Sequence, residues 1–374
     1  MIILQLRFAN TYTSFFYWFE LMVENCAETF IRKNAVDTRT TVFKITEHNG
    51  RMPHFDGMVQ DELLKVQFLS FIQTVYDQFT ENITVVNTAE LEKGIVKVSC
   101  ADLYKESSFS SGIVTQAFLG TIVDIIDEKN GWMFVQLPDG YLGWVNETIV
   151  RADTKKIIQW SNFENLLFVH AFHAAVFDPE TTTEYVGNVF MGNVLLNNGR
   201  MGSFYNVDFP DCRKGLLSVD SAMSLIEWKK VNLLTQENIV TTAKRLIGIP
   251  YVWGGCSSKG LDCSGFTKLT YFMNGYQLPR DADQQAKTGM TVDYDRSYSS
   301  LQPGDLLFFG RRADGSVDKR EGDPIPVSHV GLSLGGALFI QASGDVHKSS
   351  LDPSSSIFDK LRSESLQLVK QIIK

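Results

Sequence analysis

The sequence has little of several features that define whole classes of protein. Ten prolines in 374 residues are too few for a proline-rich scaffold. A formal net charge of −8 argues against a nucleic-acid partner, which needs a basic surface. Hydrophobic residues (44%) and charged residues (21%) occur in ordinary globular proportions, which excludes a disordered chain. A chain of this length and composition is expected to form roughly two to four globular domains.

Cysteine is also scarce. The five cysteines are scattered and odd in number, which excludes a disulfide framework. Cys256 and Cys263 lie close together, but no histidine stands at ligand spacing from them, which argues against a zinc site. We therefore expect neither a metal nor an organic cofactor.

A long uninterrupted apolar segment is missing as well. The first thirty residues are apolar and aromatic, but they include Arg7, Glu20 and Glu24 and lack a basic start. They predict neither a secretory signal nor a membrane span, and a packed or interfacial helix is the simpler interpretation of this extension, residues 1–38. The lack of a signal favours a cytoplasmic protein; a periplasmic or cell-envelope location is the alternative if the start codon is misassigned.

The pattern of apolar and polar residues changes along the middle of the chain. Residues 39–92 combine a strand-like run, "TTVFKIT", with an amphipathic helix in "DELLKVQFLSFIQTVYDQF". From residue 93, short alternating segments and turns such as "EKNG" and "PDG" predict a small β-barrel over 93–153. Residues 154–232 repeat this layout, since "VTQAFLGTIV" corresponds to "VGNVFMGNVL". We predict a second, divergent barrel there.

Residues 233–374 have an α+β pattern. "TQENIVTTAKRLIG" predicts a helix capped by Thr235 and stopped by Gly248. The runs "GDLLFF", "SHVGLSL" and "ALFIQAS" predict strands. His347, in "GDVHKSS", is interpreted as lying in an exposed turn.

The segment "GLDCSGF" places Cys263 at the start of the predicted helix "CSGFTKLTYFMNG", behind the glycine-rich "WGGCSSKGLD". Amide groups at a helix N-terminus lower a thiol pKa and suit an oxyanion hole. A buried structural cysteine is the alternative.

A cysteine nucleophile needs a histidine base, and His329 in "PVSHVGLSL" can project from one face of a sheet. Gln341 is the candidate for the group that orients its imidazole. A two-residue turn would place the two side chains on opposite faces. The functional interpretation therefore requires Gly331 to pair with Gln341, through a three-residue loop or a bulge.

Four ordered segments, "GIPYVWGGCSSKGLDCSGF", "LPRDADQQ", "LQPGDLLFF" and "SHVGLSLGGALFIQASGDV", resemble the NlpC-type cysteine peptidases of bacterial cell-wall peptides. The preceding repeats resemble bacterial SH3-like domains, and the combination is similar to the γ-D-glutamyl-L-diamino acid endopeptidases of the dipeptidyl-peptidase VI type. The resemblance implies a papain-like domain with Cys263 as nucleophile and His329 as general base. The third position is usually histidine in this family and is Gln341 here, whose oxygen can still orient the imidazole but cannot carry charge.

The resemblance also implies substrate-binding residues. Tyr251 matches a tyrosine beside the nucleophile, and Ser264 a substrate-contacting serine. Asp262 matches an aspartate that binds the free amine of the substrate's L-Ala, and it is also the expected N-cap of the cysteine helix. Glu106 and Tyr141 match first-barrel residues that fix this amine. Their alternatives are a solvated surface acid and a barrel-core tyrosine.

Two further segments bear on how the substrate is bound. Ala282 stands where the family often has serine. The charged loop 311–326 could reach the substrate through Arg311 or Arg312, although most such runs are solvated.

The resulting hypothesis is a peptidase that cleaves murein peptides with a free N-terminal L-Ala between γ-D-Glu and the diamino acid. Two alternatives remain from the residues alone. One is a non-catalytic protein that binds cell-wall peptides, which a low thiolate fraction at Cys263 would favour. The other is an acyltransferase that uses the same cysteine.

Overall fold

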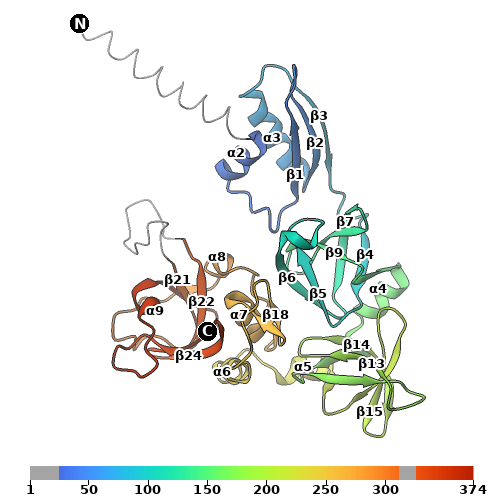
Figure 1. Ribbon diagram of the computed structural model, residues 1–374, viewed down its shortest axis with the longest axis vertical. Coiled ribbons are helices and arrows are strands. Elements are labelled where there is room, and N and C mark those ends of the chain that lie inside the picture. The colour runs from blue at the N-terminus through green and yellow to red at the C-terminus, as the bar shows by residue number, and fades with distance from the viewer. Residues whose placement is uncertain (1–24, 311–325, 374) are drawn as a thin grey trace. The chain divides into compact units, whose positions relative to one another are not determined.

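The computed structural model describes residues 25–310 and 326–373, which divide into two compact units (Figure 1). The first unit contains the chain up to Leu91 together with Gly140–Leu142. The second unit contains 92–139 and everything described from Gly143 onward. None of the helices in the described ranges combines the length and the apolar character that a membrane crossing requires.

The first unit is a small α/β structure. Its elements are α2 (Cys26–Lys33), β1 (Phe43–His48), β2 (His54–Val59), α3 (Glu62–Gln73) and β3 (Thr80–Val85). Strand β2 pairs antiparallel with β1 and parallel with β3. Four phenylalanines, Phe30, Phe43, Phe55 and Phe68, pack edge-to-face or stacked in its core. The strand and the helix predicted in this region are β1 and α3.

The second unit begins with two seven-stranded sheets. The first contains β4 (Glu92–Val96), β5 (Cys100–Tyr104), β6 (Ile113–Phe118), β7 (Ile122–Lys129), β8 (Trp132–Gln136), β9 (Leu142–Asn146) and β10 (Ile149–Ala152). The second contains β11 (Leu166–Val169), β12 (Ala174–Phe177), β13 (Tyr185–Val189), β14 (Val194–Met201), β15 (Phe204–Asp208), β16 (Lys214–Ser218) and β17 (Ala222–Ser224). Helix α4 (Thr154–Ser161) connects them, and α5 (Leu225–Val231) follows.

The two sheets share one strand order. The first is ordered β10-β4-β7-β8-β9-β5-β6, and the second, taken in the same sense, β17-β11-β14-β15-β16-β12-β13. Each strand of one sheet thus has a counterpart seven strands later, as an internal repeat requires. Within the described residues, the terminal strands β10 and β6 do not pair with each other, so closure of the sheet into a barrel stays a prediction.

The remaining elements form an α+β domain. They are α6 (Gln236–Arg245), β18 (Cys256–Ser257), β19 (Gly260–Leu261), α7 (Cys263–Phe272), α8 (Ala282–Gln285), β20 (Met290–Thr291), β21 (Pro303–Phe309), β22 (His329–Gly335), β23 (Leu338–Ser343), β24 (Asp345–Ser350), α9 (Lys360–Ser365) and β25 (Leu366–Gln371). The main sheet is ordered β20-β25-β21-β22-β23-β24. Helix α7 contacts β22 and β23 and buries nearly every side chain, including Phe266 and Leu269.

Local signals explain several boundaries of this domain. The Thr235 side chain accepts from the Asn238 N–H at the start of α6, and Gly248, just beyond the helix, has a φ of +88°. The predicted strands are β21, β22 and β23. The prediction for His347 was wrong: it lies within β24, where it pairs with Gln341. A strand continues there because β23 offers it a full antiparallel partner.

Candidate active site

Helix α7 begins at Cys263, as the sequence predicts. Asp262 is its N-cap, and its Oδ1 accepts the Gly265 N–H at 2.7 Å. Gly265 is required sterically, because a Cβ at this position would lie 2.0 Å from the carbonyl oxygen of Gly255. Gly254, with a φ of +78°, allows the preceding loop to turn back against the helix start. The glycines of this segment therefore position the sulfur.

The Cys263 thiol is almost enclosed, with 9% of the residue exposed. Burial raises the pKa of this thiol, and the negative charge of Asp262 raises it further. The backbone N–H groups of Val330 and Ser264 donate toward the sulfur and lower the pKa. The sulfur thus lies near the start of strand β22, next to the backbone of Val330, the residue that follows His329.

Strands β22 and β23 have the register that the functional interpretation requires. Gly331 pairs with Gln341, and an irregularity between Ser333 and Gly335 supplies the extra residue. His329 and Gln341 are therefore diagonal neighbours on one face of the sheet. Their side chains are joined by a hydrogen bond of 2.8 Å between His329 Nε2 and Gln341 Oε1.

The His329 imidazole is deeply buried, with 6% exposed. Burial and the nearby charge of Arg362 lower its pKa from 6.5 to about 3, while the bond to Gln341 and the charge of Asp359 act in the opposite direction. Because burial disfavours both charged forms, the free protein holds a neutral thiol and a neutral imidazole at pH 7. A neutral imidazole keeps one ring nitrogen unprotonated, and that nitrogen can accept a hydrogen bond or a proton.

Arg280, in the segment "LPRDADQQ", was missed by the sequence reasoning. It is 2% exposed and forms a fork with Asp262: Nη2 donates to Oδ2 at 2.5 Å and Nη1 to Oδ1 at 3.2 Å. Nη1 also donates to Ser264 Oγ at 2.9 Å. The structure therefore brings Asp262 and Ser264 together through a buried cation. The signal that could have revealed it is Asp262 itself, since a buried carboxylate needs a charged partner.

Tyr251 lies close to this group. Its phenol is half-buried, and burial followed by the charges of Cys263 and Asp262 raises its pKa to about 12. A phenol with this pKa remains protonated at neutral pH and can donate a hydrogen bond. Its backbone N–H donates to Gly344 O at 2.8 Å, which ties the segment before the nucleophile to the end of β23.

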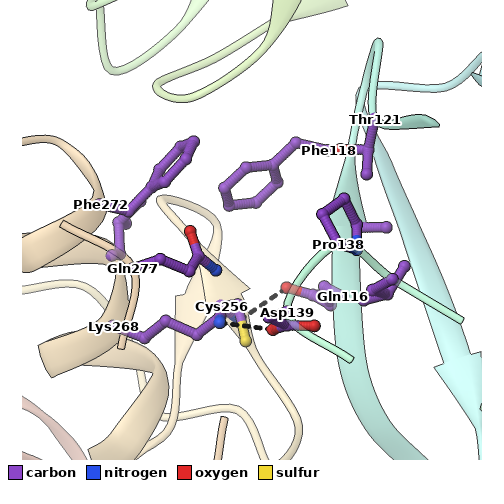
Figure 2. Close-up of a pocket in the computed structure, with 12 residues that line it drawn as sticks. Gln116, Phe118, Thr121, Pro138, Asp139, Cys256, Lys268, Phe272 and Gln277 are labelled. Carbon is purple, nitrogen blue, oxygen red and sulfur yellow. Dashed lines mark hydrogen bonds and ion pairs between the residues drawn. The ribbon is translucent and has the colours of Figure 1, made fainter. Parts of the chain in front are cut away.

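The first seven-stranded sheet packs directly against the domain that contains Cys263. Figure 2 shows two polar links across this contact, from Lys268 Nζ to Asp139 Oδ2 at 2.6 Å and from the Cys256 N–H to Gln116 Oε1 at 2.8 Å. They border a cavity of about 150 Å³, where the rings of Phe118 and Phe272 lie 6.0 Å apart. Because Lys268 is in α7, these links hold the helix that begins at Cys263 against the sheet.

A third link reaches the buried cation itself. Arg280 Nε donates to Oγ1 of Thr115, a fully buried residue of β6. The first sheet thereby contacts the guanidinium group that pairs with Asp262.

The two residues expected from the first repeat differ in exposure. Glu106 is exposed in the turn after β5, where its N–H donates to Ser111 Oγ at 3.0 Å. Tyr141 is buried, with 4% exposed. The roles of both as amine ligands remain predictions. Arg311 and Arg312 lie outside the described residues.

Comparison with known proteins agrees with this geometry. Residues 248–362 match the NlpC/P60 family. The chain carries an NlpC/P60 domain. Residues 103–148 match the bacterial dipeptidyl-peptidase Sh3 domain. The predicted resemblance is thus confirmed, and the α+β class with it.

Two curated relatives of this chain are named as peptidases. A γ-D-glutamyl-L-lysine dipeptidyl-peptidase of Bacillus cereus is 27% identical over 61% of this chain and 66% of its own length. Dipeptidyl-peptidase 6 of Lysinibacillus sphaericus is 26% identical over 71% of this chain and 93% of its own length. By sequence, therefore, the chain groups with enzymes of the cysteine peptidase type.

A solved structure supports the fold over a long stretch. The crystal structure of an NlpC/P60 family protein from Bacillus cereus covers 75% of this chain and 99% of its own, with a TM-score of 0.61 and 22% identity. At this identity the likeness shows a shared fold.

Proposed function

We propose that this protein is a cysteine peptidase that hydrolyses the bond between γ-D-Glu and the diamino acid in murein peptides with a free N-terminal L-Ala. The observation that carries the proposal is the arrangement at the start of α7 and β22. There the Cys263 sulfur lies beside the strand that presents a neutral His329 bonded to Gln341. The names of the relatives supply the class of substrate.

The reaction follows papain-like chemistry. His329 takes the thiol proton as the Cys263 sulfur attacks the γ-carbonyl carbon of D-Glu. Collapse of the tetrahedral intermediate expels the amine of the diamino acid, which leaves with the proton from His329. Water, deprotonated by His329, then hydrolyses the thioester and regenerates the thiol. Gln341 orients the imidazole throughout, since its side-chain oxygen accepts a hydrogen bond from the Nε2–H group of His329.

The substrate's amine end is assigned to a second group of residues. Tyr251 and Ser264 would contact the peptide beside the nucleophile, and Asp262 would contribute negative charge. Because Arg280 already neutralises Asp262, the exposed carboxylate of Glu106 becomes the stronger partner for the L-Ala ammonium. Tyr141 is assigned to the same amine, and a substrate with a blocked amine would bring no cation to the Glu106 carboxylate.

The proposal includes a division of the chain. We assign 1–38 to an N-terminal extension, 39–92 to an α/β segment, 93–153 and 154–232 to SH3-like barrels, and 233–374 to the papain-like peptidase domain. Turnover or recycling of cell-wall peptides would be the cellular role.

A second candidate function is binding of the same peptides without cleavage. The observation that favours it is the raised pKa of the Cys263 thiol, which leaves little thiolate at pH 7.

The deciding experiment is mass spectrometry of the full chain with L-Ala-γ-D-Glu-diaminopimelate, its lysine counterpart and their N-acetylated forms. Release of L-Ala-γ-D-Glu from the free peptides alone, and its loss in Cys263→Ala, would support the peptidase. Equal cleavage of free and acetylated peptides would overturn the roles of Glu106 and Tyr141. Binding of the peptides without cleavage would favour the second candidate.

A further inference from the structure

The Gln341 side chain uses all its hydrogen-bonding capacity. Its Oε1 accepts from His329 Nε2 at 2.8 Å and from Arg362 Nε at 2.9 Å. Its Nε2 donates to Ser349 Oγ at 2.9 Å and to Asp359 Oδ2 at 2.8 Å. Only 1% of the residue is exposed, so these bonds are not exchanged with water.

Two of these partners, Arg362 and Asp359, have fixed roles as hydrogen-bond donor and acceptor. A guanidinium only donates, and an ionised carboxylate only accepts. A flipped Gln341 amide would therefore turn its NH₂ group toward Arg362 and its oxygen toward Asp359, and both bonds would be lost. Ser349, a hydroxyl, can donate or accept and does not discriminate. The charged residues alone determine which end of the amide faces His329.

The orientation of the amide determines the position of the imidazole proton. Gln341 Oε1 can only accept, so His329 must carry its proton on Nε2. In a neutral ring this leaves the lone pair on Nδ1, which is then the one ring position able to take a proton from Cys263.

We propose that Arg362 and Asp359 are positioning residues: by fixing the Gln341 amide they hold His329 as the Nε2–H tautomer, with Nδ1 as the base. This inference rests on the proposed function for its catalytic meaning, but the tautomer is a property of the free protein. It also gives a reason why glutamine can occupy the third position: a cation on its oxygen and a carboxylate on its NH₂ group distinguish the two ends of the amide.

The two charged residues are themselves held in place. Asp359 is the N-cap of α9, where its Oδ1 accepts the Arg362 N–H at 3.0 Å. The Arg362 guanidinium lies 5.5 Å from the centre of the Phe309 ring, and that ring lies 5.7 Å from His329. Both charges therefore reach Gln341 from α9.

The charges around His329 come from several elements. Arg362 and His347, from α9 and β24, oppose the imidazolium, and Asp359 favours it. Cys263 at the start of α7 is the remaining titratable partner in the proposed reaction. Because both side chains bond to Gln341, replacing them together removes the two charged contacts that orient its amide.

The test uses the full chain labelled with [¹⁵N]histidine. Imidazole nitrogen shifts distinguish the two neutral tautomers, and the spectrum of His329→Gln identifies the His329 signals. We expect wild type to show only the Nε2–H form at pH 7. The double variant Asp359→Asn/Arg362→Gln should show a mixture with Nδ1–H. Asp359→Asn alone, which keeps an acceptor for the cap, should shift the tautomer in the same direction if the double variant does not fold.

The matched control is Lys360→Gln in the same helix, where the side chain is exposed and bonded to Glu364 rather than to Gln341. It should leave the His329 signals unchanged. In peptide cleavage, the Asp359 and Arg362 variants should lower kcat on the order of tenfold to hundredfold, the scale expected for a misplaced catalytic group, with KM little changed.

The outcomes separate this inference from the proposed function. A tautomer that changes in the variants, in a protein that cleaves no peptide, would support the inference and refute the peptidase. An Nδ1–H form in wild type, or a single Nε2–H form in both Asp359→Asn and the double variant, would overturn the inference even if the peptidase is correct.

Discussion

Replacement of Arg280 by methionine is expected to destabilise the second unit strongly. Arg280 and Asp262 are 2% and 7% exposed, and the fork between them is a buried ion pair beside Cys263, the first residue of α7. Removing one partner of such a pair costs about 3–5 kcal/mol, because the other charge stays buried. At about 2–4 °C per kcal/mol for domains of some 150–250 residues, Tm should fall on the order of 10 °C.

The assay is thermal unfolding followed by far-UV circular dichroism, with two further variants. Arg280→Lys keeps the charge but loses the fork, so it should lie between wild type and Arg280→Met. The double variant Arg280→Met/Asp262→Asn should regain more than half of the lost Tm. No buried charge then remains, and asparagine still caps α7.

Either of two results would refute this reasoning. A Tm of Arg280→Met within about 1 °C of wild type, well below the shift expected for a broken buried pair, would mean that water reaches Asp262. A double variant less stable than Arg280→Met would mean that packing of the long side chain, rather than charge, is what Arg280 contributes.

Three other predictions concern stability. The unfolded chain protonates His329 near its usual pKa of 6.5 and the folded chain only near about 3, so the free energy of unfolding of wild type should decrease as the pH is lowered through this window, by about 1 kcal/mol per pH unit. Urea unfolding at pH 7 and at pH 5 should show a smaller decrease for His329→Gln, and equal decreases would contradict the assignment. Gly265→Ala places a Cβ 2.0 Å from a carbonyl oxygen and should lower Tm and abolish peptide cleavage, whereas Gly50→Ala, with its nearest contact at 3.7 Å, should change neither. Asp139→Asn should lower Tm by leaving the buried Lys268 ammonium without its carboxylate, at a cost on the order of 3 kcal/mol, and an unchanged Tm would show that the pair is solvated.

Short-range chemistry made the surroundings of Cys263 predictable. The acid before Cys263 caps the helix, and the glycine after Ser264 packs against the loop, because both effects act within a few residues. The pairing of Gly331 with Gln341 could also be stated in advance, since a strand has only two faces and only one register unites the two side chains.

Long-range contacts could not be predicted in the same way. Arg280 lies far along the chain from Thr115, and Arg362 from Gln341, so no periodic pattern links them. His347 was misjudged because its segment has the polar composition of a turn, while the neighbouring strand supplies the hydrogen bonds that make it a strand. The barrel-like repeats were visible as patterns, but whether their edges close depends on pairings between distant strands.

The place of β25 in the main sheet has a consequence for synthesis on the ribosome. This strand lies between β20 and β21, yet it is translated after every other strand of that sheet. The helix that carries Arg362 comes just before it. A nascent chain that has already exposed Cys263 and His329 therefore lacks both the strand beside β21 and the contacts of Asp359 and Arg362 with Gln341. We expect hydrolytic competence only after residue 371 has left the exit tunnel, so an incomplete chain would be released without activity.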